Sequence, residues 1–231
     1  ILKYIKSKNR FLSKNWKVNI LNEQLKNKIS INSKIEKASI NSKEIKRNNI
    51  FFAIKGKNKD GNFFVKDALK NGASIAIVSK IDRSTNKSKQ ILVKDSLKSL
   101  TNFSKKIRFS SKAKIIAITG SCGKTSLKEI IVNVLGKFDN VSFSPKSYNN
   151  KYGVPLSLFN LNPKHDYGIF EVGMDKKGEI NFLSKIIKPD VGIITNISYA
   201  HAKNFKNIKQ IAMAKAEIIN NIKSNGTLIL N

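Results

Sequence analysis

Short apolar runs, each bounded by polar residues or glycine, recur along the chain from about residue 50 onwards. A run of this length without alternation is typical of a strand that is buried on both faces. The runs predict strands over residues 50–54, 74–78, 91–93, 115–119, 168–172, 191–196 and 227–230. Residues 1–30 have only scattered apolar positions, which predict short helices or irregular chain.

Apolar residues three and four positions apart lie between several of these runs, and this spacing predicts helices. The predicted helices cover residues 63–71, 95–109, 126–135, 179–187 and 208–222. The first follows the turn dipeptide Asp60-Gly61 and ends before Gly72, and Asp95 or Ser96 is the expected N-cap of the second. Apolar residues on one face are Phe64, Ala68 and Leu69 in the first helix and Leu97, Leu100 and Phe103 in the second, and Leu127, Ile130, Ile131, Val134 and Leu135 stand at helical spacing in the third.

Strands that alternate with helices are typical of the α/β class with a mostly parallel sheet. After about residue 112 the order of predicted elements changes to strand, glycine-containing loop, helix and strand. We therefore expect two domains, a small α/β domain with a connecting helix over residues 1–112 and a mostly parallel α/β domain over residues 113–231.

The length of 231 residues and the hydrophobic fraction of 40% are enough for two modest cores. No stretch approaches the roughly 20 successive apolar residues of a membrane helix, and the N-terminal ILKYIKSKNR lacks the apolar segment of a secretory leader. Because the chain does not begin with Met, we expect its start to be missing. Cys122 is the only cysteine of the sequence, which excludes an intrachain disulfide and favours a reducing compartment.

The formal net charge of +29 invites the hypothesis of a polyanionic partner such as a nucleic acid or an anionic membrane. The basic residues, however, are spread along the whole chain and form neither a tail nor one helix stripe. We therefore interpret the charge as a lysine-rich composition with solvated side chains, and expect no specific nucleic acid and no membrane as partners. The charge should still attract a small anionic substrate.

The strongest local signal is a predicted strand joined directly to a predicted helix through a turn with two glycines, IIAITGSCGKTS over residues 115–126. Such a turn lets successive backbone N–H groups point at phosphate oxygens, and the helix N-terminus favours negative charge. Lys124 is expected to reach the outer phosphates and the Thr125 hydroxyl to bind Mg²⁺. The candidate ATP-binding residues are Thr119, Gly120, Ser121, Cys122, Gly123, Lys124 and Thr125.

This loop departs from the common phosphate-binding pattern, which has a glycine five residues before its Gly-Lys pair. Ile118 stands at that position, and Gly120 lies only three residues before Gly123. The alternative is a strand–turn–helix corner with a surface lysine. The strand, both glycines, the Lys124-Thr125 pair and the following helix together favour the phosphate loop.

The loop resembles the shortened ATP-binding loop of the Mur ligase family, and several other blocks resemble that family in the same order. They are Ile50 to Ala73 upstream, Asn149-Asn150 with Gly153-Val154-Pro155, Glu171-Val172-Gly173-Met174 with Gly178-Glu179-Ile180, Pro189-Asp190 with Thr195-Asn196-Ile197, Ala200-His201 with Phe205, and Ala214-Lys215-Ala216-Glu217-Ile218. The resemblance covers nearly the whole chain from about residue 35. One departure is Asn41-Ser42-Lys43, where the family usually has Asp-Ser-Arg, and lysine loses the bidentate fork of arginine.

Within the family, the blocks are most similar to the ligases that join D-alanyl-D-alanine to UDP-N-acetylmuramoyl-tripeptide through an acyl phosphate in bacterial cell-wall synthesis. The resemblance implies ATP and Mg²⁺, with two metal sites, as cofactors, and a monomer in the bacterial cytoplasm. It also implies a UDP-substrate-binding first domain, a central ATP-binding domain that is only partial here, and an absent C-terminal domain. We therefore expect residues 1–231 alone to be inactive as a ligase.

The resemblance also assigns roles to individual residues. Glu171 follows the apolar run 168–170 and is implied as a ligand of the Mg²⁺ that Thr125 binds, whereas His201 and Lys215, carbamylated by CO₂, are implied for the second metal. A carbamate forms only on a neutral amine, so the pKa of Lys215 should be lowered. The implied catalytic residues are Lys124, Lys215 and His201, and the implied substrate-binding residues are Ser42, Lys43, Asn149 and Asn150. For the asparagine pair, a simple turn before a helix remains the alternative.

Three other interpretations stay open. Within the family, the ligase that adds the third amino acid shares the first-domain pattern, although the blocks around Asn149 and Gly178 argue against it. From a different class, the chain could be a basic NTPase that binds nucleic acid, which predicts strongly salt-dependent binding. The third is a remnant that binds nucleotide without catalysis. The sequence does not distinguish lysine from diaminopimelate in the tripeptide.

Overall fold

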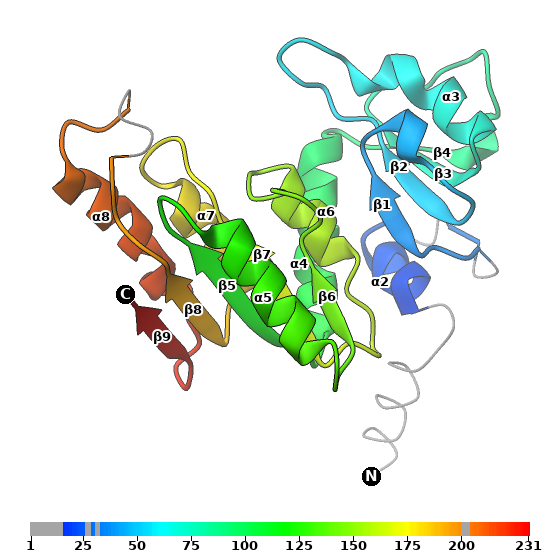
Figure 1. The fold of residues 1–231 in the computed structure, drawn as a ribbon. Coiled ribbons are helices and arrows are strands. Elements are labelled where there is room, and N and C mark those ends of the chain that lie inside the picture. The colour runs from blue at the N-terminus through cyan, green and yellow to red at the C-terminus, as the bar shows by residue number, and fades with distance from the viewer. Residues whose placement is uncertain (1–15, 26–28, 31–32, 200–203) are drawn as a thin grey trace. The chain divides into compact units, whose positions relative to one another are not determined.

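The computed structural model describes residues 16–25, 29–30, 33–199 and 204–231. The chain divides into two compact units, Ile1–Ser110 and Ser111–Asn231. The change in pattern along the sequence predicts a boundary near residue 112. Each unit has its own sheet and is described by itself (Figure 1).

The sheet of the first unit has four parallel strands among the described residues, in the order β1-β2-β3-β4. The strands are β1 (Lys37–Ser39), β2 (Asn49–Phe52), β3 (Ala73–Val78) and β4 (Gln90–Leu92). The apolar runs correctly predicted β2, β3 and β4. They missed β1, because Lys-Ala-Ser has no apolar pattern and its pairing with β2 holds it in the sheet.

The helices of the first unit are α2 (Trp16–Leu25), α3 (Val65–Lys70) and α4 (Ser96–Ser110), with short 3₁₀ helices η1 (Ser42–Glu44), η2 (Gly61–Phe64) and η3 (Lys87–Lys89). The prediction of one helix over 63–71 was wrong at its start. Asp60 caps η2 by accepting a hydrogen bond from the Asn62 N–H, so α3 begins only at Val65, which is buried while Phe64 is partly exposed. Asp95 caps α4 as expected, since its Oδ1 accepts from the Lys98 N–H at 2.9 Å.

The sheet of the second unit is also wholly parallel among the described residues, in the order β6-β7-β5-β8-β9. Its strands are β5 (Lys114–Thr119), β6 (Val141–Phe143), β7 (Tyr167–Glu171), β8 (Val191–Ile194) and β9 (Thr227–Leu230). The predicted α/β class with mostly parallel sheets is confirmed. β6 was not predicted, because three residues with a central serine give no distinct signal.

The helices of the second unit are α5 (Lys124–Leu135), α6 (Gly153–Phe159), α7 (Glu179–Ile187) and α8 (Ile208–Ala216), which continues as the 3₁₀ helix η5 (Glu217–Asn221). In Figure 1, α5 lies in front of the sheet and α7 behind it. The predicted helix over 208–222 was therefore wrong in its last turns. α6 was not predicted as an element.

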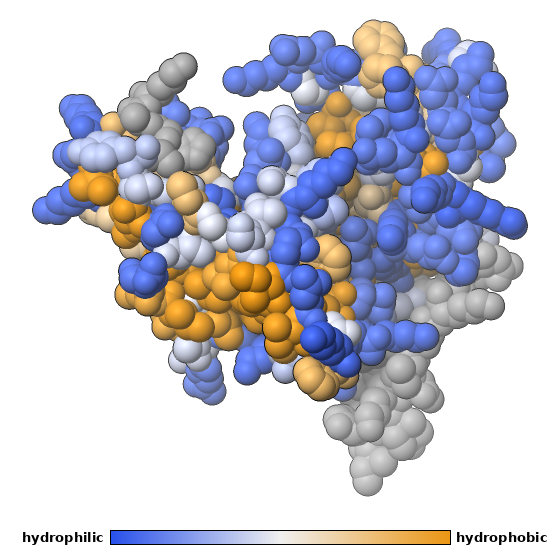
Figure 2. All heavy atoms as spheres, viewed as in Figure 1, coloured by the Kyte–Doolittle hydropathy of each residue, from blue (hydrophilic) through white to orange (hydrophobic). Residues whose placement is uncertain are grey.

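The face of α5 that packs on the sheet is narrower than its apolar pattern suggested. Leu127, Ile131 and Leu135 pack against a core of isoleucines from β5, β7 and β8. Ile130 and Val134, which stand at the same helical spacing, are exposed. Figure 2 shows an apolar area over α5, β8 and β9.

Candidate nucleotide and metal site

The candidate phosphate loop runs from the end of β5 to the first residue of α5, and two of its residues must be glycine. Gly120 has a φ of +147° and Gly123 a φ of +79°, which L-residues with a side chain rarely adopt. A Cβ on Gly120 would lie 1.8 Å from the Oγ1 of Thr195, whereas a Cβ on Gly123 would meet no atom within 4 Å. Position 120 therefore requires glycine because another segment approaches it closely. Position 123 requires glycine because of its backbone conformation.

The segment after β8 holds this loop in place. The N–H of Ser121 donates to the carbonyl oxygen of Asn196 at 3.1 Å, and the N–H of Cys122 donates to the side-chain oxygen of Asn196 at 3.0 Å. The hydroxyl of Thr195 donates to the carbonyl oxygen of Cys122 at 2.6 Å. Thr195 and Asn196 had no predicted role, although their position directly after β8, the strand beside β5, was a signal.

Lys124 begins α5 and folds back over the loop. Its Nζ donates to the carbonyl oxygens of Gly120 at 2.6 Å and Ser121 at 3.3 Å. Burial lowers the pKa of Lys124, and the nearby groups of Glu171 and Cys122 act in the opposite direction. The ammonium therefore lies against the backbone of the candidate phosphate loop.

Glu171 is the last residue of β7 and lies beside Ile118 of β5 in the sheet. Its side chain is fully buried, and its Oε1 lies 2.9 Å from the Nζ of Lys128. Among the described residues, no hydrogen-bond donor is aligned on either Oε1 or Oε2, so the contact of Oε1 with Lys128 is an ion pair. A buried carboxylate oxygen without a donor is costly unless a cation or another donor binds it.

Lys128 is a site residue that the sequence analysis missed. It lies on α5 one turn after Lys124 and is fully buried, in a chain whose lysines were interpreted as solvated. Its Nζ donates to the carbonyl oxygens of Ser144 at 3.0 Å and Lys146 at 2.7 Å. The signal was its spacing, since it stands three residues before Ile131 on the face that packs on the sheet.

Lys215 lies near the end of α8, and only 2% of its surface is exposed. Burial, assisted by the charge of Lys124, lowers its pKa from 10.5 to about 8. Lys124 therefore interacts electrostatically with both Glu171 and Lys215, as expected if the three groups share one site. His201, the fourth group predicted there, lies outside the described residues.

The two asparagines before α6 differ in their surroundings. The Oδ1 of Asn150 accepts hydrogen bonds from the N–H groups of Tyr152 and Gly153, both at 3.0 Å, so it caps the helix start as in the turn alternative. The carbonyl oxygen of Asn149 accepts from the Gly173 N–H at 2.7 Å, and a Cβ on Gly173 would lie 2.8 Å from the Asn149 side chain. Asn149 thus lies against the chain that follows Glu171.

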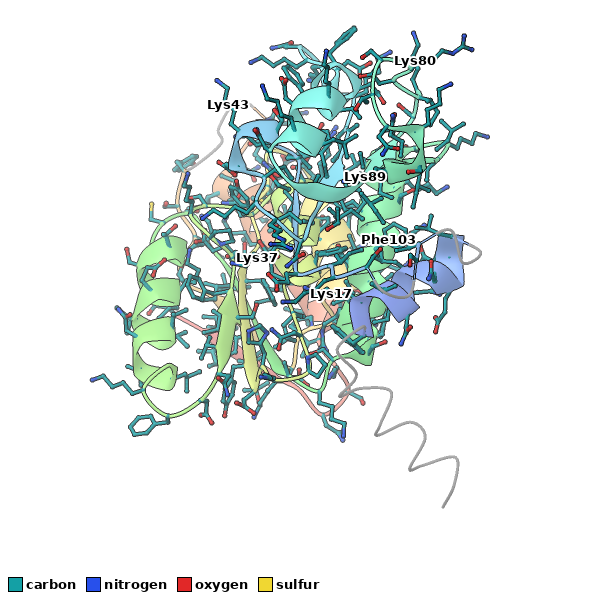
Figure 3. All side chains as sticks on the ribbon, turned by 90° about the vertical axis from the view of Figure 1, so that its right-hand side faces the viewer. Lys17, Lys37, Lys43, Lys80, Lys89 and Phe103 are labelled. Atoms are coloured by element: carbon teal, nitrogen blue, oxygen red, sulfur yellow. The ribbon has the colours of Figure 1, made fainter. Side chains whose placement is uncertain are left out.

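Ser42 and Lys43, the candidates for the UDP moiety, lie in the first unit on η1, after the carboxyl end of β1. Ser42 is buried, and its carbonyl oxygen accepts a hydrogen bond from the Asn71 side chain at 3.0 Å. Lys43 is exposed (Figure 3). Its ammonium is therefore accessible to an anionic ligand.

The residues of the second unit fit a magnesium ion that is shared with phosphate. The described residues contain no group of three or more His, Cys, Asp and Glu side chains arranged to hold a metal. They do offer the buried Oε2 of Glu171 and the exposed Thr125 at the start of α5. Mg²⁺ commonly binds through one or two carboxylates plus phosphate oxygens and water, so a small protein donor set suits it.

In the described part of the chain, none of the helices is long and apolar enough to cross a membrane.

Comparisons with known proteins agree over both units. The model "Mur ligase family, catalytic domain" matches residues 34–106, and the model "Mur ligase middle domain" matches residues 118–231. The chain is 39% identical over 217 residues to the UDP-N-acetylmuramoyl-tripeptide--D-alanyl-D-alanine ligase of Rickettsia prowazekii, which covers 94% of this chain and 48% of the relative. The chain thus spans about half the length of the curated relatives that it matches.

Two solved structures have the same fold. The crystal structure of MurF from Acinetobacter baumannii matches with a TM-score of 0.80 and 31% identity, over 92% of this chain and 48% of that one. MurF from Thermotoga maritima in complex with ADP matches with a TM-score of 0.72 and 32% identity, over 84% of this chain and 45% of that one.

Proposed function

Because this chain belongs to the Mur ligase family, we propose that it is the substrate- and nucleotide-binding part of a ligase that adds D-alanyl-D-alanine to UDP-N-acetylmuramoyl-tripeptide. The observation that carries the proposal is the phosphate loop with Lys124, whose charge interacts with those of Glu171 and Lys215. The complete protein would act as a monomer in the bacterial cytoplasm.

The proposed reaction has two steps. The free carboxylate of the tripeptide attacks the γ-phosphorus of ATP, so that an acyl phosphate forms and ADP leaves. The amine nitrogen of D-alanyl-D-alanine then attacks the carbonyl carbon, the C–O bond to phosphate breaks, and the amine gives up a proton as the amide forms. Both steps gather several anions in a small space, which favours a site with preorganised positive charge.

The phosphate loop and Lys124 would stabilise the phosphate chain. The N–H groups at the start of α5 add the positive end of the helix dipole to the lysine charge. Because Thr195 and Asn196 fix the loop, these donors need little rearrangement when negative charge moves to the oxygen between the β- and γ-phosphates.

Mg²⁺ would neutralise phosphate charge when bound, and Thr125 and Glu171 are the residues proposed to hold it. For a second ion we propose His201 and a carbamate on Lys215, formed when the neutral amine bonds to CO₂ and loses a proton. A pKa of about 8 leaves roughly one Lys215 amine in ten neutral at pH 7, against about one in three thousand for a pKa of 10.5. The low pKa thus supports carbamylation.

The first unit would bind the UDP group, with Ser42 and Lys43 near the carboxyl end of β1. Parallel α/β sheets place ligands at that edge. Lys43 can attract the diphosphate as a point charge, although it lacks the bidentate geometry of arginine.

The test is phosphate release from ATP by the complete protein. Release should require both UDP-N-acetylmuramoyl-tripeptide and D-alanyl-D-alanine, and Lys124→Met should abolish it. A matched control is Lys137→Met, which removes an exposed lysine just after the same helix. ATP hydrolysis that ignores both substrates and responds to DNA or RNA would refute the ligase and favour the nucleic-acid-dependent NTPase.

A further inference from the structure

The ion pair of Lys128 and Glu171 lies within the second unit, and both side chains are fully buried. A second carboxylate, Glu129, also approaches the Nζ of Lys128, at 3.1 Å, but about half of its side chain is exposed, so solvent weakens its effect. Glu171 is therefore the main ion-pair partner of Lys128.

Four oxygens lie around the Nζ of Lys128. It donates hydrogen bonds to the carbonyl oxygens of Ser144 and Lys146, and it lies within ion-pair distance of Oε1 of Glu171 and of the half-exposed Glu129. Because the two carbonyls belong to the backbone, the ammonium has little freedom to move. Its charge thus attracts Oε1 of Glu171 at 2.9 Å, while among the described residues neither carboxylate oxygen has an aligned hydrogen-bond donor and Oε2 has no ion-pair partner either.

The same ammonium fixes the loop between β6 and α6. Lys146 has a φ of +50°, which is uncommon for a residue with a side chain, and its carbonyl is one of the two that Lys128 binds. Ser144 is tied to the end of β7 as well, since its Oγ accepts a hydrogen bond from the Glu171 N–H at 3.2 Å. Asn149 follows in this loop and lies against Gly173.

We propose that Lys128 is a positioning residue for the nucleotide-bound Mg²⁺. Its charge orients Glu171 so that Oε2 is available to the ion, and its hydrogen bonds fix the loop that leads to Asn149. Lys128 itself touches neither nucleotide nor substrate. The proposal rests on the proposed function, because that function supplies the metal and the nucleotide.

The first experiment measures the binding of a fluorescent ATP analogue to the whole chain as Mg²⁺ is titrated. In Lys128→Met we expect the Mg²⁺ concentration for half-maximal effect to rise by about 10- to 100-fold, the usual result of removing a partner of a metal ligand. Binding in EDTA should change less than about twofold, because the phosphate loop and Lys124 remain. Lys137→Met, with the same loss of charge, should resemble the wild type.

The result that overturns the proposal is a folded Lys128→Met protein with an unchanged Mg²⁺ dependence. Lys128→Met leaves a buried carboxylate unpaired, and it can therefore fail to fold. The second experiment avoids this by comparing Glu171→Gln with the double variant Lys128→Met/Glu171→Gln, neither of which has an unpaired carboxylate at position 171.

The second experiment follows hydrogen exchange of the amides of residues 144–150. We expect exchange in the double variant to be about tenfold faster or more than in Glu171→Gln, because the carbonyls of Ser144 and Lys146 lose their donor. Equal exchange would overturn the loop part of the proposal. If the wild type bound no nucleotide with or without Mg²⁺, the proposed function would fail, and the exchange experiment would still decide whether Lys128 positions the loop.

Discussion

At the scale of single residues, the phosphate loop depends on an atom that belongs to another segment. Gly120 approaches Thr195 so closely that any side chain on it must displace the Thr195 hydroxyl. Gly123 has free space and only an unusual φ. The two glycines should therefore respond differently to the same substitution.

We predict that Gly120→Ala abolishes binding of an ATP analogue and lowers the free energy of unfolding by more than about 2 kcal/mol, through overpacking and strain. Gly123→Ala should lower it by only about 1 kcal/mol, since backbone strain acts alone. Adding Thr195→Ala to Gly120→Ala should recover part of the lost stability, because the clashing oxygen is gone. Equal losses from the two single variants in chemical denaturation would contradict this explanation.

The proposed carbamate at Lys215 leads to a test by chemical rescue. Lys215→Ala should abolish ligase turnover of the complete protein, because the buried anion that would hold the second metal cannot form. Formate or acetate should restore part of the turnover by placing a carboxylate in the space of the missing side chain. Chloride at the same ionic strength is the control, and a variant that is active without any additive would remove Lys215 from the site.

A buried lysine in the first unit should make stability depend on pH. Burial and the charge of Lys37 lower the pKa of Lys17 from 10.5 to about 7, against the opposing effect of Glu36 (Figure 3). Between these two values the unfolded chain holds a proton that the folded chain lacks, so stability rises with pH. Below about pH 7 the amine is protonated in both the folded and the unfolded chain, so the free-energy cost of burying its charge no longer changes with pH.

From pH 7 to pH 10, the free energy of unfolding of the wild type should therefore rise more than that of Lys17→Met, by on the order of 2–4 kcal/mol. Lys89→Met removes an exposed lysine of the same unit and should keep the wild-type dependence. Denaturant unfolding at several pH values measures the difference. If the free energy of unfolding changed with pH equally in the wild type and in Lys17→Met, burial of the charged amine would have no such cost.

At the scale of elements, α8 ends where a side chain of its continuation forms hydrogen bonds with the start of α7. The carboxylate of Glu217 accepts hydrogen bonds from the N–H groups of Gly178 at 2.8 Å and Asn181 at 3.0 Å, at the start of α7. The chain tightens to a 3₁₀ helix at the same residue. The pattern of apolar positions continues through this point, which explains why the sequence predicted one long helix.

Removing this cap should destabilise the second unit. We expect Glu217→Ala to lower the free energy of unfolding by about 1–2 kcal/mol, because two N–H groups lose a charged acceptor at a helix N-terminus. Glu23→Ala, which removes an exposed ion pair with Lys106, should change it by less than about 1 kcal/mol. Thermal and denaturant unfolding would measure both, and equal effects would contradict a capping role.

The sequence predicted the elements that have long apolar runs, because burial alone determines them. The strands β2, β3, β5, β7 and β8 are of this kind. The three-residue strands β1 and β6 could not be found, because pairing with a neighbouring strand defines them. Lys128 was missed for a related reason, since its burial depends on carbonyls and a carboxylate supplied by distant segments.

At the scale of the whole molecule, the chain has 44 Lys and Arg residues against 15 Asp and Glu residues, so only a minority of the basic side chains can have a carboxylate partner. The ion pairs with Lys34 and Lys106 are exposed and contribute little. The lysines should therefore repel one another in the folded state more than in the expanded chain.

We predict that the melting temperature rises as NaCl increases from about 10 mM to about 150 mM, over which the screening length falls from about 30 Å to about 8 Å. KCl should give the same increase, since screening depends on ionic strength and not on the identity of the cation. A melting temperature that falls or stays constant would show that self-repulsion does not limit stability.

The order of the strands in the second sheet has a consequence for synthesis on the ribosome. β5 and the phosphate loop are made early, but the loop takes its shape from Asn196, and Lys215 comes later still. A nascent chain that ends before Asn196 contains the glycine turn but lacks the hydrogen bonds that hold it. We therefore expect that the proposed nucleotide would stabilise the nascent chain only after β8 and Asn196 have been made.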